Sequence, residues 1–406
     1  MHCLALVSAV DPLLVDLTAL ALHGEEALVL TASLHDDGAP AAPGAEDGFI
    51  RLTAAHVPFG DAESAPVLDV ARTTDCWTCS LREVLLAVVE DRARLEPDGA
   101  TVVLLPPGVE LIHLAPLLAE ELAELPGVAL AGLAHIIDAD TAARDLLTHQ
   151  RLPDSVVAAE DQCAGEVHMV ALGYADVVVA LGRDPVGLDL VEHLRPHDTL
   201  MLPGLEAPLL PELLALRHDA DAAVARVHPA TTRAWGGPAD HGVWTLDLSA
   251  SLPFHPGRLR ELVADLAGYG LCARGCFWLP SRPGRVCAWE VAGGAVSVGD
   301  AGTWDEAPEW DPDGIPGGRA PDGGSVWRGR AATWWSPAWA MRRCASGCGR
   351  RSAGYCCARM RWPRPCPGSA PMTAWGTGSV PDALLPGFAR RLGSGLRAGL
   401  SKTEEI

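Results

Sequence analysis

The chain has 406 residues, of which 49% are hydrophobic and 20% charged, as in a globular protein with a substantial core. It has no run of about 18 uninterrupted apolar residues, so the sequence predicts no membrane-spanning helix. The N-terminus lacks the basic region of a signal peptide, so we expect a cytoplasmic protein. Twelve cysteines without a short, disulfide-dense layout favour a reducing compartment, where close thiol pairs bind metals or do redox chemistry.

The charge is divided unevenly along the chain. Residues 327–406 hold 13 basic and 3 acidic residues, which leaves 18 basic and 49 acidic residues for the rest. An acidic body repels phosphates, so we exclude nucleic acid as its partner, whereas cations remain compatible with it. Lys402 is the only lysine, so no mechanism that needs a lysine in the folded body is available.

Short apolar runs, each bounded by turn or polar residues, predict strands that alternate with helices. The helical patterns cover residues 80–95 and 114–125. This alternation predicts an α/β domain over residues 1–216, with a mostly parallel sheet covered on both faces. The predicted strands lie at 4–10, 26–34, 101–107, 128–139 and 175–182.

The pattern changes after a predicted linker at 217–243, which is rich in turn formers. Residues 244–310 predict a small α+β domain, with a helix that starts near "FHPGRL" and strands at "CARGCFWLPS" and "RVCAWEVAGG". We expect residues 311–406 to be disordered, because the segment 311–330 is rich in Gly, Pro and Asp and the rest lacks a helical or strand period.

The stretch "DCWTCSLREVLL" at 75–86 carries Cys76 and Cys79 at the start of a helical pattern. Two thiolates at this spacing can chelate zinc or a similar ion, form a redox disulfide, or be a buried pair without function. A closed zinc site needs four ligands, and two are missing locally. Asp75, His56 and Glu83 are the nearby residues that could complete it.

These segments together resemble the CobW family of P-loop GTPases, which are metal chaperones and metal insertases. The resemblance is carried by "PFHPGRLRELVADLAG", "GCFWLPS", "CAWEVAGG" and "AGTW" between residues 253 and 304, similar to the family's C-terminal domain. It is also carried by "CWTCSLREVL", which keeps the first and last cysteines of the family's Cys-x-Cys-Cys motif and has Thr78 in place of the middle one. The resemblance implies a P-loop-like first domain and a metal, zinc or cobalt, held by Cys76 and Cys79.

The nucleotide motifs of the family are mostly missing. A phosphate loop needs glycines, a lysine and a hydroxyl between a strand and a helix. The corresponding stretch "LVSAVDPLLVDLTALAL" at 6–22 has none of the glycines and no lysine, and Leu14 or Val15 takes the lysine's place. The metal-sensing loop is replaced by "LLPPGVEL" at 104–111. The family implies GTP hydrolysis, but these departures predict a degenerate site with poor GTP binding.

The guanine-reading motif Asn-Lys-x-Asp corresponds to Leu181-Gly182-Arg183-Asp184. Only Asp184 matches, and the resemblance implies that it would bind the base. The alternative is that Asp184 is a turn residue at the end of a strand, before Pro185.

The resemblance therefore implies a metal chaperone that delivers its ion to a client metalloprotein. A rival interpretation is a non-catalytic regulatory or scaffold protein that keeps the fold for partner binding. A working GTPase with an unorthodox pocket is the third.

The basic tail has two explanations. It holds six of the 13 tryptophans and the run "RRCASGCGRRSAGYCCARMRW", which suits either a basic arm for nucleic acid or a frameshifted sequence. Read two nucleotides later, the codons of residues 333–341 can encode a strand and turn like the family's closing strand. We hypothesise a frameshift between about residues 305 and 330, which predicts an unpaired sheet edge in the second domain.

Overall fold

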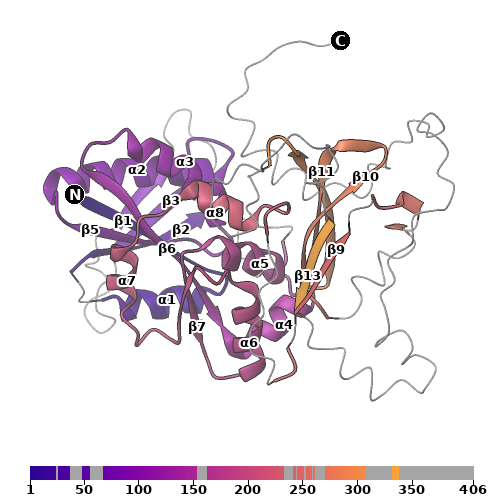
Figure 1. Ribbon diagram of the computed structural model, residues 1–406. Helices are drawn as coiled ribbons and strands as arrows, with labels where there is room; N and C mark the ends of the chain where they lie inside the picture. The colour runs from indigo at the N-terminus through magenta and orange to yellow at the C-terminus, as the bar shows by residue number, and fades with distance from the viewer. Residues whose placement is uncertain are drawn as a thin grey trace, which may run out of the picture. The chain divides into compact units, whose positions relative to one another are not determined.

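The structure is a computed structural model, and it describes most of the first three quarters of the chain (Figure 1). The chain divides into two compact units, residues 1–224 and 225–406. The division falls inside the predicted linker 217–243, where the structure has a helix, α8 (Ala220–Val227). The described residues are 1–23, 26–36, 48–54, 67–152, 162–232, 241–243, 245–250, 253–257, 259–260, 270–307 and 332–337.

The first unit has a central sheet whose elements alternate with helices, as the sequence predicts. In chain order they are β1 (His2–Ala9), α1 (Pro12–Ala21), β2 (Leu28–His35), β3 (Phe49–Ala54), β4 (Val67–Ala71), α2 (Trp77–Leu95), β5 (Ala100–Leu104), α3 (Leu111–Ala123), β6 (Val128–Asp138), α4 (Ala139–Leu147), α5 (Ala164–Tyr174), β7 (Val177–Leu181), α6 (Pro185–Leu194), β8 (Leu200–Leu202) and α7 (Leu209–Ala215).

The sheet has the strand order β4-β3-β2-β5-β1-β6-β7-β8. Pairing is parallel from β2 through β8, and antiparallel between β2 and β3 and between β3 and β4. All five strands predicted from apolar runs are present, and the expected α/β fold with a mostly parallel sheet is confirmed. No described helix is both long and apolar enough to cross a lipid bilayer.

Both faces of the sheet are covered, which explains why β1 is apolar without alternation. Ala5, Val7 and Ala9 of β1 pack in one core cluster with residues of α1 and α7. Because side chains alternate along a strand, Leu4 and Leu6 lie on the opposite face, where α2 and α3 pack against the sheet (Figure 1).

The sheet has a topological switch between β1 and β6. The chain leaves β1 through α1 toward β2 on one side, and leaves β6 through α4 and α5 toward β7 on the other. In open α/β sheets the crevice at the carboxyl ends of such strands is the usual ligand site. Val10, Asp11 and Asp138 come from this edge.

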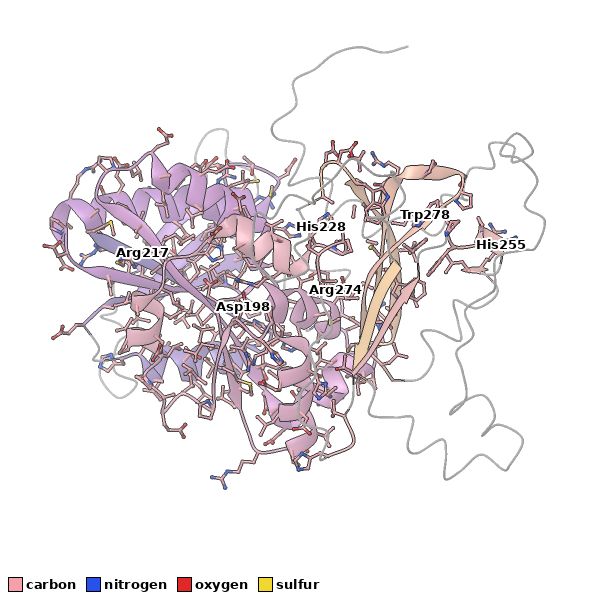
Figure 2. All side chains as sticks on the ribbon, in the orientation of Figure 1. Asp198, Arg217, His228, His255, Arg274 and Trp278 are labelled. Carbon is pink, nitrogen blue, oxygen red and sulfur yellow. The ribbon has the colours of Figure 1, made fainter. Side chains whose placement is uncertain are left out.

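The second unit contains an antiparallel sheet with the order β12-β11-β10-β13-β9. Its strands are β9 (Thr245–Ala250), β10 (Ala273–Leu279), β11 (Arg282–Ala292), β12 (Ala295–Thr303) and β13 (Ala332–Pro337). Phe254, Phe277 and Trp289 belong to its core. Arg274 of β10, labelled in Figure 2, forms a buried ion pair of 3.9 Å with its cross-strand partner Glu290 of β11. A second small domain is therefore confirmed.

One expectation about this domain differs from the structure. Ala332–Pro337 lies in the segment expected to be disordered, yet it forms β13 between β10 and β9. Trp334 pairs in register with Gly275, so the β10 side of the sheet is not the unpaired edge that the frameshift hypothesis predicts. The remaining residues of 311–406 lie outside the described part of the chain.

Candidate metal site

Cys76 and Cys79 lie together at the beginning of α2. Cys76 is the N-cap residue, and its Sγ accepts a hydrogen bond of 3.2 Å from the backbone N–H of Cys79. Cys76 is exposed and Cys79 is half-buried. The structure therefore brings the two sulfur-bearing residues into one turn at the surface, with Cys76 as the more accessible of the two.

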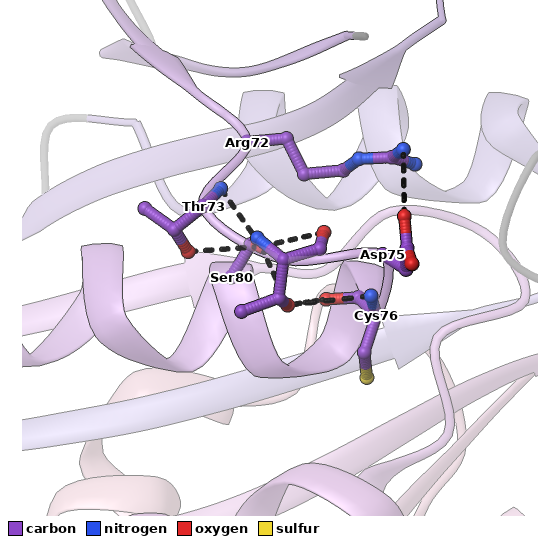
Figure 3. A network of polar contacts seen from close by, with 6 residues as sticks. Arg72, Thr73, Asp75, Cys76 and Ser80 are labelled. Carbon is purple, nitrogen blue, oxygen red and sulfur yellow. Dashed lines mark hydrogen bonds and ion pairs between the residues drawn. The ribbon is translucent and has the colours of Figure 1, made fainter. Parts of the chain in front are cut away.

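The loop that leads into α2 is held by Ser80 (Figure 3). The buried Ser80 Oγ accepts hydrogen bonds from the backbone N–H of Thr73, at 3.3 Å, and of Thr74, at 3.2 Å. The Thr74 hydroxyl in turn donates to the carbonyl oxygen of Cys76 at 3.1 Å. These contacts fix residues 73–76 against the first turn of the helix, so the position of Cys76 is set by local hydrogen bonds.

Two charged residues flank the pair. The Arg72 guanidinium lies 4.6 Å from the centre of the Trp77 ring and 3.8 Å from the carboxylate of Asp75.

Burial, and then a hydrogen bond with Cys76, raise the pKa of the Cys79 thiol to about 11. Binding a cation must therefore displace a proton from Cys79, as metal binding to thiols generally does.

The other proposed ligands do not join the cysteines. Asp75 faces Arg72, and Glu83 accepts a hydrogen bond of 2.7 Å from the Thr73 hydroxyl. His56 lies outside the described residues. Within the described part of the chain, no group of three or more His, Cys, Asp and Glu side chains could hold a metal ion. The thiol pair by itself offers two ligands.

The place of the phosphate loop is filled by a short connection. Only Val10 and Asp11 join β1 to α1. Asp11 is the N-cap of α1, and its carboxylate accepts a hydrogen bond of 2.8 Å from the Leu13 N–H. The helix N-terminus, which binds phosphate in nucleotide sites, thus already has an anionic partner. Leu14 and Val15 are buried in the core beneath it.

Asp184 is the N-cap of α6. Its carboxylate accepts hydrogen bonds from the backbone N–H groups of Val186 and Gly187, at 3.4 and 3.3 Å. Its own N–H donates to Asp140 Oδ1 at 2.7 Å, which ties this loop to the start of α4. These contacts fit the turn-residue interpretation, and a role in reading guanine remains a prediction.

Sequence reasoning did not single out a buried histidine pair beside the switch point. His135 Nε2 lies 2.9 Å from His168 Nδ1, and His135 Nδ1 lies 2.9 Å from Ser8 Oγ. His168 lines a cavity of about 220 Å³ together with Asp11, Asp138 and Asp145. Burial lowers the pKa of His168 to about 4 and lowers the pKa of His135 well below its usual value. Both rings are therefore neutral at neutral pH.

The histidine pair is connected to the backbone through Ser8. Ser8 Oγ lies 2.9 Å from Nδ1 of His135 and 3.4 Å from the carbonyl oxygen of Ala134, so it connects the histidine pair to the backbone of β6. In the bond between the two neutral rings, one ring donates its N–H and the other accepts it. No sequence signal points to this pair, because the two histidines are 33 residues apart.

Comparison with known protein families finds a match in the second unit. Residues 243–321 match the family model described as "Cobalamin synthesis protein cobW C-terminal domain", which confirms the resemblance seen at 253–304. The zinc chaperone Rv0106 of Mycobacterium tuberculosis and the uncharacterized protein Mb0109 of Mycobacterium bovis are each 28% identical over 244 residues. The match covers 56% of this chain and 58% of each relative, so it spans less than two thirds of their length.

A solved structure was also found to be similar. The Zn(II)-bound YjiA GTPase from E. coli has 11% sequence identity and a TM-score of 0.32, with 83% of this chain and 94% of that chain covered.

Proposed function

We propose that this protein, which is CobW-like and carries the CobW C-terminal domain, is a carrier of a divalent metal ion. Zinc is the first candidate for its cargo and cobalt the second. Cys76 and Cys79 hold the ion, and the protein passes it to a client metalloprotein. The zinc chaperone among its relatives supports this choice of cargo.

One observation supports the proposal above the others: the thiol pair sits at the surface, on the first turn of α2. A carrier must release its ion to another protein by exchange of ligands, so at least one of its ligands must be reachable. Cys76 is exposed, and a ligand of the client can approach the ion from that side.

The number of ligands also fits a carrier. Zinc in closed structural sites has four protein ligands, whereas this turn supplies two thiolates. The remaining positions are available to water, to residues outside the described part of the chain, or to the client. An ion held in this way is bound by chelation and is still open to exchange.

We further propose that metal delivery does not depend on GTP hydrolysis in this chain. Phosphoryl transfer needs backbone N–H groups and positive charge around the phosphates. The carboxylate of Asp11 occupies the first turn of α1, and Leu14 and Val15 belong to the core. The acidic edge next to them, with Asp138 and Asp145, would add repulsion.

The test is metal analysis on the full chain, purified and kept reduced, then loaded with Zn²⁺ and freed of excess ion. We expect about one equivalent of zinc per chain. The double variant Cys76→Ser with Cys79→Ser should lose it while its circular dichroism and unfolding midpoint stay unchanged. The matched control is Cys3→Ser with Cys287→Ser, which removes two other half-buried thiols and should keep the zinc.

Unchanged zinc content in the Cys76/Cys79 variant would overturn the assignment of the ligands. A reduced wild-type chain that binds no zinc or cobalt would favour the scaffold interpretation instead.

A further inference from the structure

We infer that Cys76 and Cys79 also form a reversible disulfide, so that oxidation of this pair by a small-molecule disulfide ejects the bound metal ion. The exchange chemistry rests on the geometry of the pair. Only the ejection of the ion rests on the proposed function.

The two residues are placed for a disulfide. They are three positions apart at a helix start, a spacing at which side chains lie on the same face. The N–H of Cys79 already contacts the Sγ of Cys76 at 3.2 Å. A disulfide needs two thiols within reach of each other and no further ligand.

The pair is also asymmetric, as thiol–disulfide exchange requires. Cys76 is exposed and can be reached by a small disulfide, whereas Cys79 is half-buried behind it. The Sγ of Cys76 accepts a hydrogen bond from the backbone N–H of Cys79, so the more accessible sulfur lies next to its partner residue. Cys76 is therefore the attacking sulfur and Cys79 the resolving one.

The surrounding structure can keep its shape during the change. Ser80 Oγ and the backbone of Thr73 and Thr74 hold the loop against the helix, and the Sγ of Cys76 takes no part in these contacts (Figure 3). Because these hydrogen bonds do not involve the sulfur atoms, they can persist in both the dithiol and the disulfide form.

The reaction proceeds in two exchanges. The thiolate of Cys76 attacks one sulfur of a disulfide RSSR, which forms a Cys76–SR bond and releases RS⁻. Cys79 then loses its proton to solvent, attacks the Sγ of Cys76, and releases the second RS⁻. RSSR is reduced by two electrons, and the cysteine pair is oxidised by two.

The overall stoichiometry of the exchange is the same when the pair holds zinc. Two zinc-bound thiolates and one RSSR give one protein disulfide, one Zn²⁺ ion and two RS⁻. The ion leaves because a disulfide has no thiolate charge with which to hold it. Reduction of the disulfide restores the two ligands.

Trypsin provides a clean readout of this chemistry. Cleavage after Arg72 and Arg82 yields the peptide "TTDCWTCSLR", which contains Cys76 and Cys79 and no other cysteine. After treatment of the native full chain with oxidised glutathione and blocking of free thiols, we expect this peptide to have lost two hydrogen atoms. Dithiothreitol should reverse the loss, and the half-buried Cys287 should remain a free thiol throughout.

Single variants test the order of the two steps. Cys79→Ser should accumulate a glutathione adduct on Cys76, because the resolving thiol is gone. Cys76→Ser should form at least tenfold less adduct on Cys79, because that sulfur is half-buried. Equal adducts in both variants, or a wild-type peptide that stays fully reduced, would overturn the inference.

Zinc release separates this inference from the proposed function. With the zinc-loaded chain, oxidised glutathione should release the ion into a chromophoric chelator in step with disulfide formation. If the reduced chain binds zinc and the peptide never oxidises, only the redox inference fails. If the peptide oxidises reversibly in a chain that never binds zinc, the disulfide stands and metal carriage fails.

Discussion

The imidazole rings of His135 and His168 are joined by a hydrogen bond of 2.9 Å between Nε2 of the first and Nδ1 of the second. Both rings are buried, His135 on β6 and His168 on α5. Burial lowers the pKa of His168, and the charge of Asp145, which also lines the cavity, raises it by a smaller amount.

This pair predicts that the protein loses stability in mild acid. The pKa of His168 is about 4 in the folded chain, below the usual 6.5, so the unfolded chain takes up a proton first as the pH falls. The free energy of unfolding should therefore decrease from about pH 6.5 to about pH 4, by about 3 kcal/mol for one such histidine.

Urea unfolding at several pH values measures the effect. His168→Gln should reduce the dependence and leave the share of His135, whereas His23→Gln, at an exposed position, should leave all of it intact. A wild-type chain equally stable at pH 7 and pH 4.5 would contradict the assignment of neutral, buried rings.

Gly187 predicts a steric effect at the contact between α6 and α4. A Cβ at this position would lie 1.8 Å from the carbonyl oxygen of Ala139, which is backbone and cannot move aside alone. Gly187→Ala should cost at least about 2 kcal/mol in urea unfolding, as overpacked sites do. Gly284→Ala is the control, since nothing lies within 4 Å of its Cβ. Similar stabilities of the two variants would refute this packing.

Ser80 predicts an effect on the loop before the thiol pair. Ser80→Ala removes the acceptor of the Thr73 and Thr74 N–H groups and should lower the free energy of unfolding by about 1–3 kcal/mol. It should also weaken zinc binding, because Cys76 loses its fixed position. Thr78→Ala, in the same turn, should change neither. A Ser80 variant as stable as wild type would show that the loop is held by other contacts.

The β1–α1 connection predicts poor nucleotide binding. With Asp11 at the first turn of α1, calorimetry should detect no saturable GTP binding at micromolar concentrations. Asp11→Asn, which removes the charge, should not restore it, because the connection still lacks the glycines and lysine of a phosphate loop. A dissociation constant near 1 μM, about −8 kcal/mol, would show that another pocket binds the nucleotide.

Several strands of the first sheet could be predicted because a strand buried on both faces is apolar at consecutive positions of the sequence. Residues 102–104 and 177–181 are continuous apolar runs, and both lie in strands of the parallel sheet. The CxxC pair of Cys76 and Cys79 could be noticed from its spacing, because it is a local pattern at a helix start, and its role in metal binding stays a prediction. Asp184 before Pro185 likewise carries the local signal of a helix N-cap.

Other features depend on contacts between distant segments, and only the tertiary structure decided them. β3, β4 and β13 are strands because a neighbour supplies their hydrogen bonds, and β13 was expected to be disordered. The pairing of His135 with His168 depends on the packing of α5 beside β6. Spacing placed the two thiols in one turn, but only the structure shows that Cys76 is exposed and Cys79 half-buried. Turns, helix caps and buried strands depend on residues that are close in sequence and can be predicted from it. Burial and strand pairing depend on contacts with residues that are distant in sequence, which only the folded structure shows.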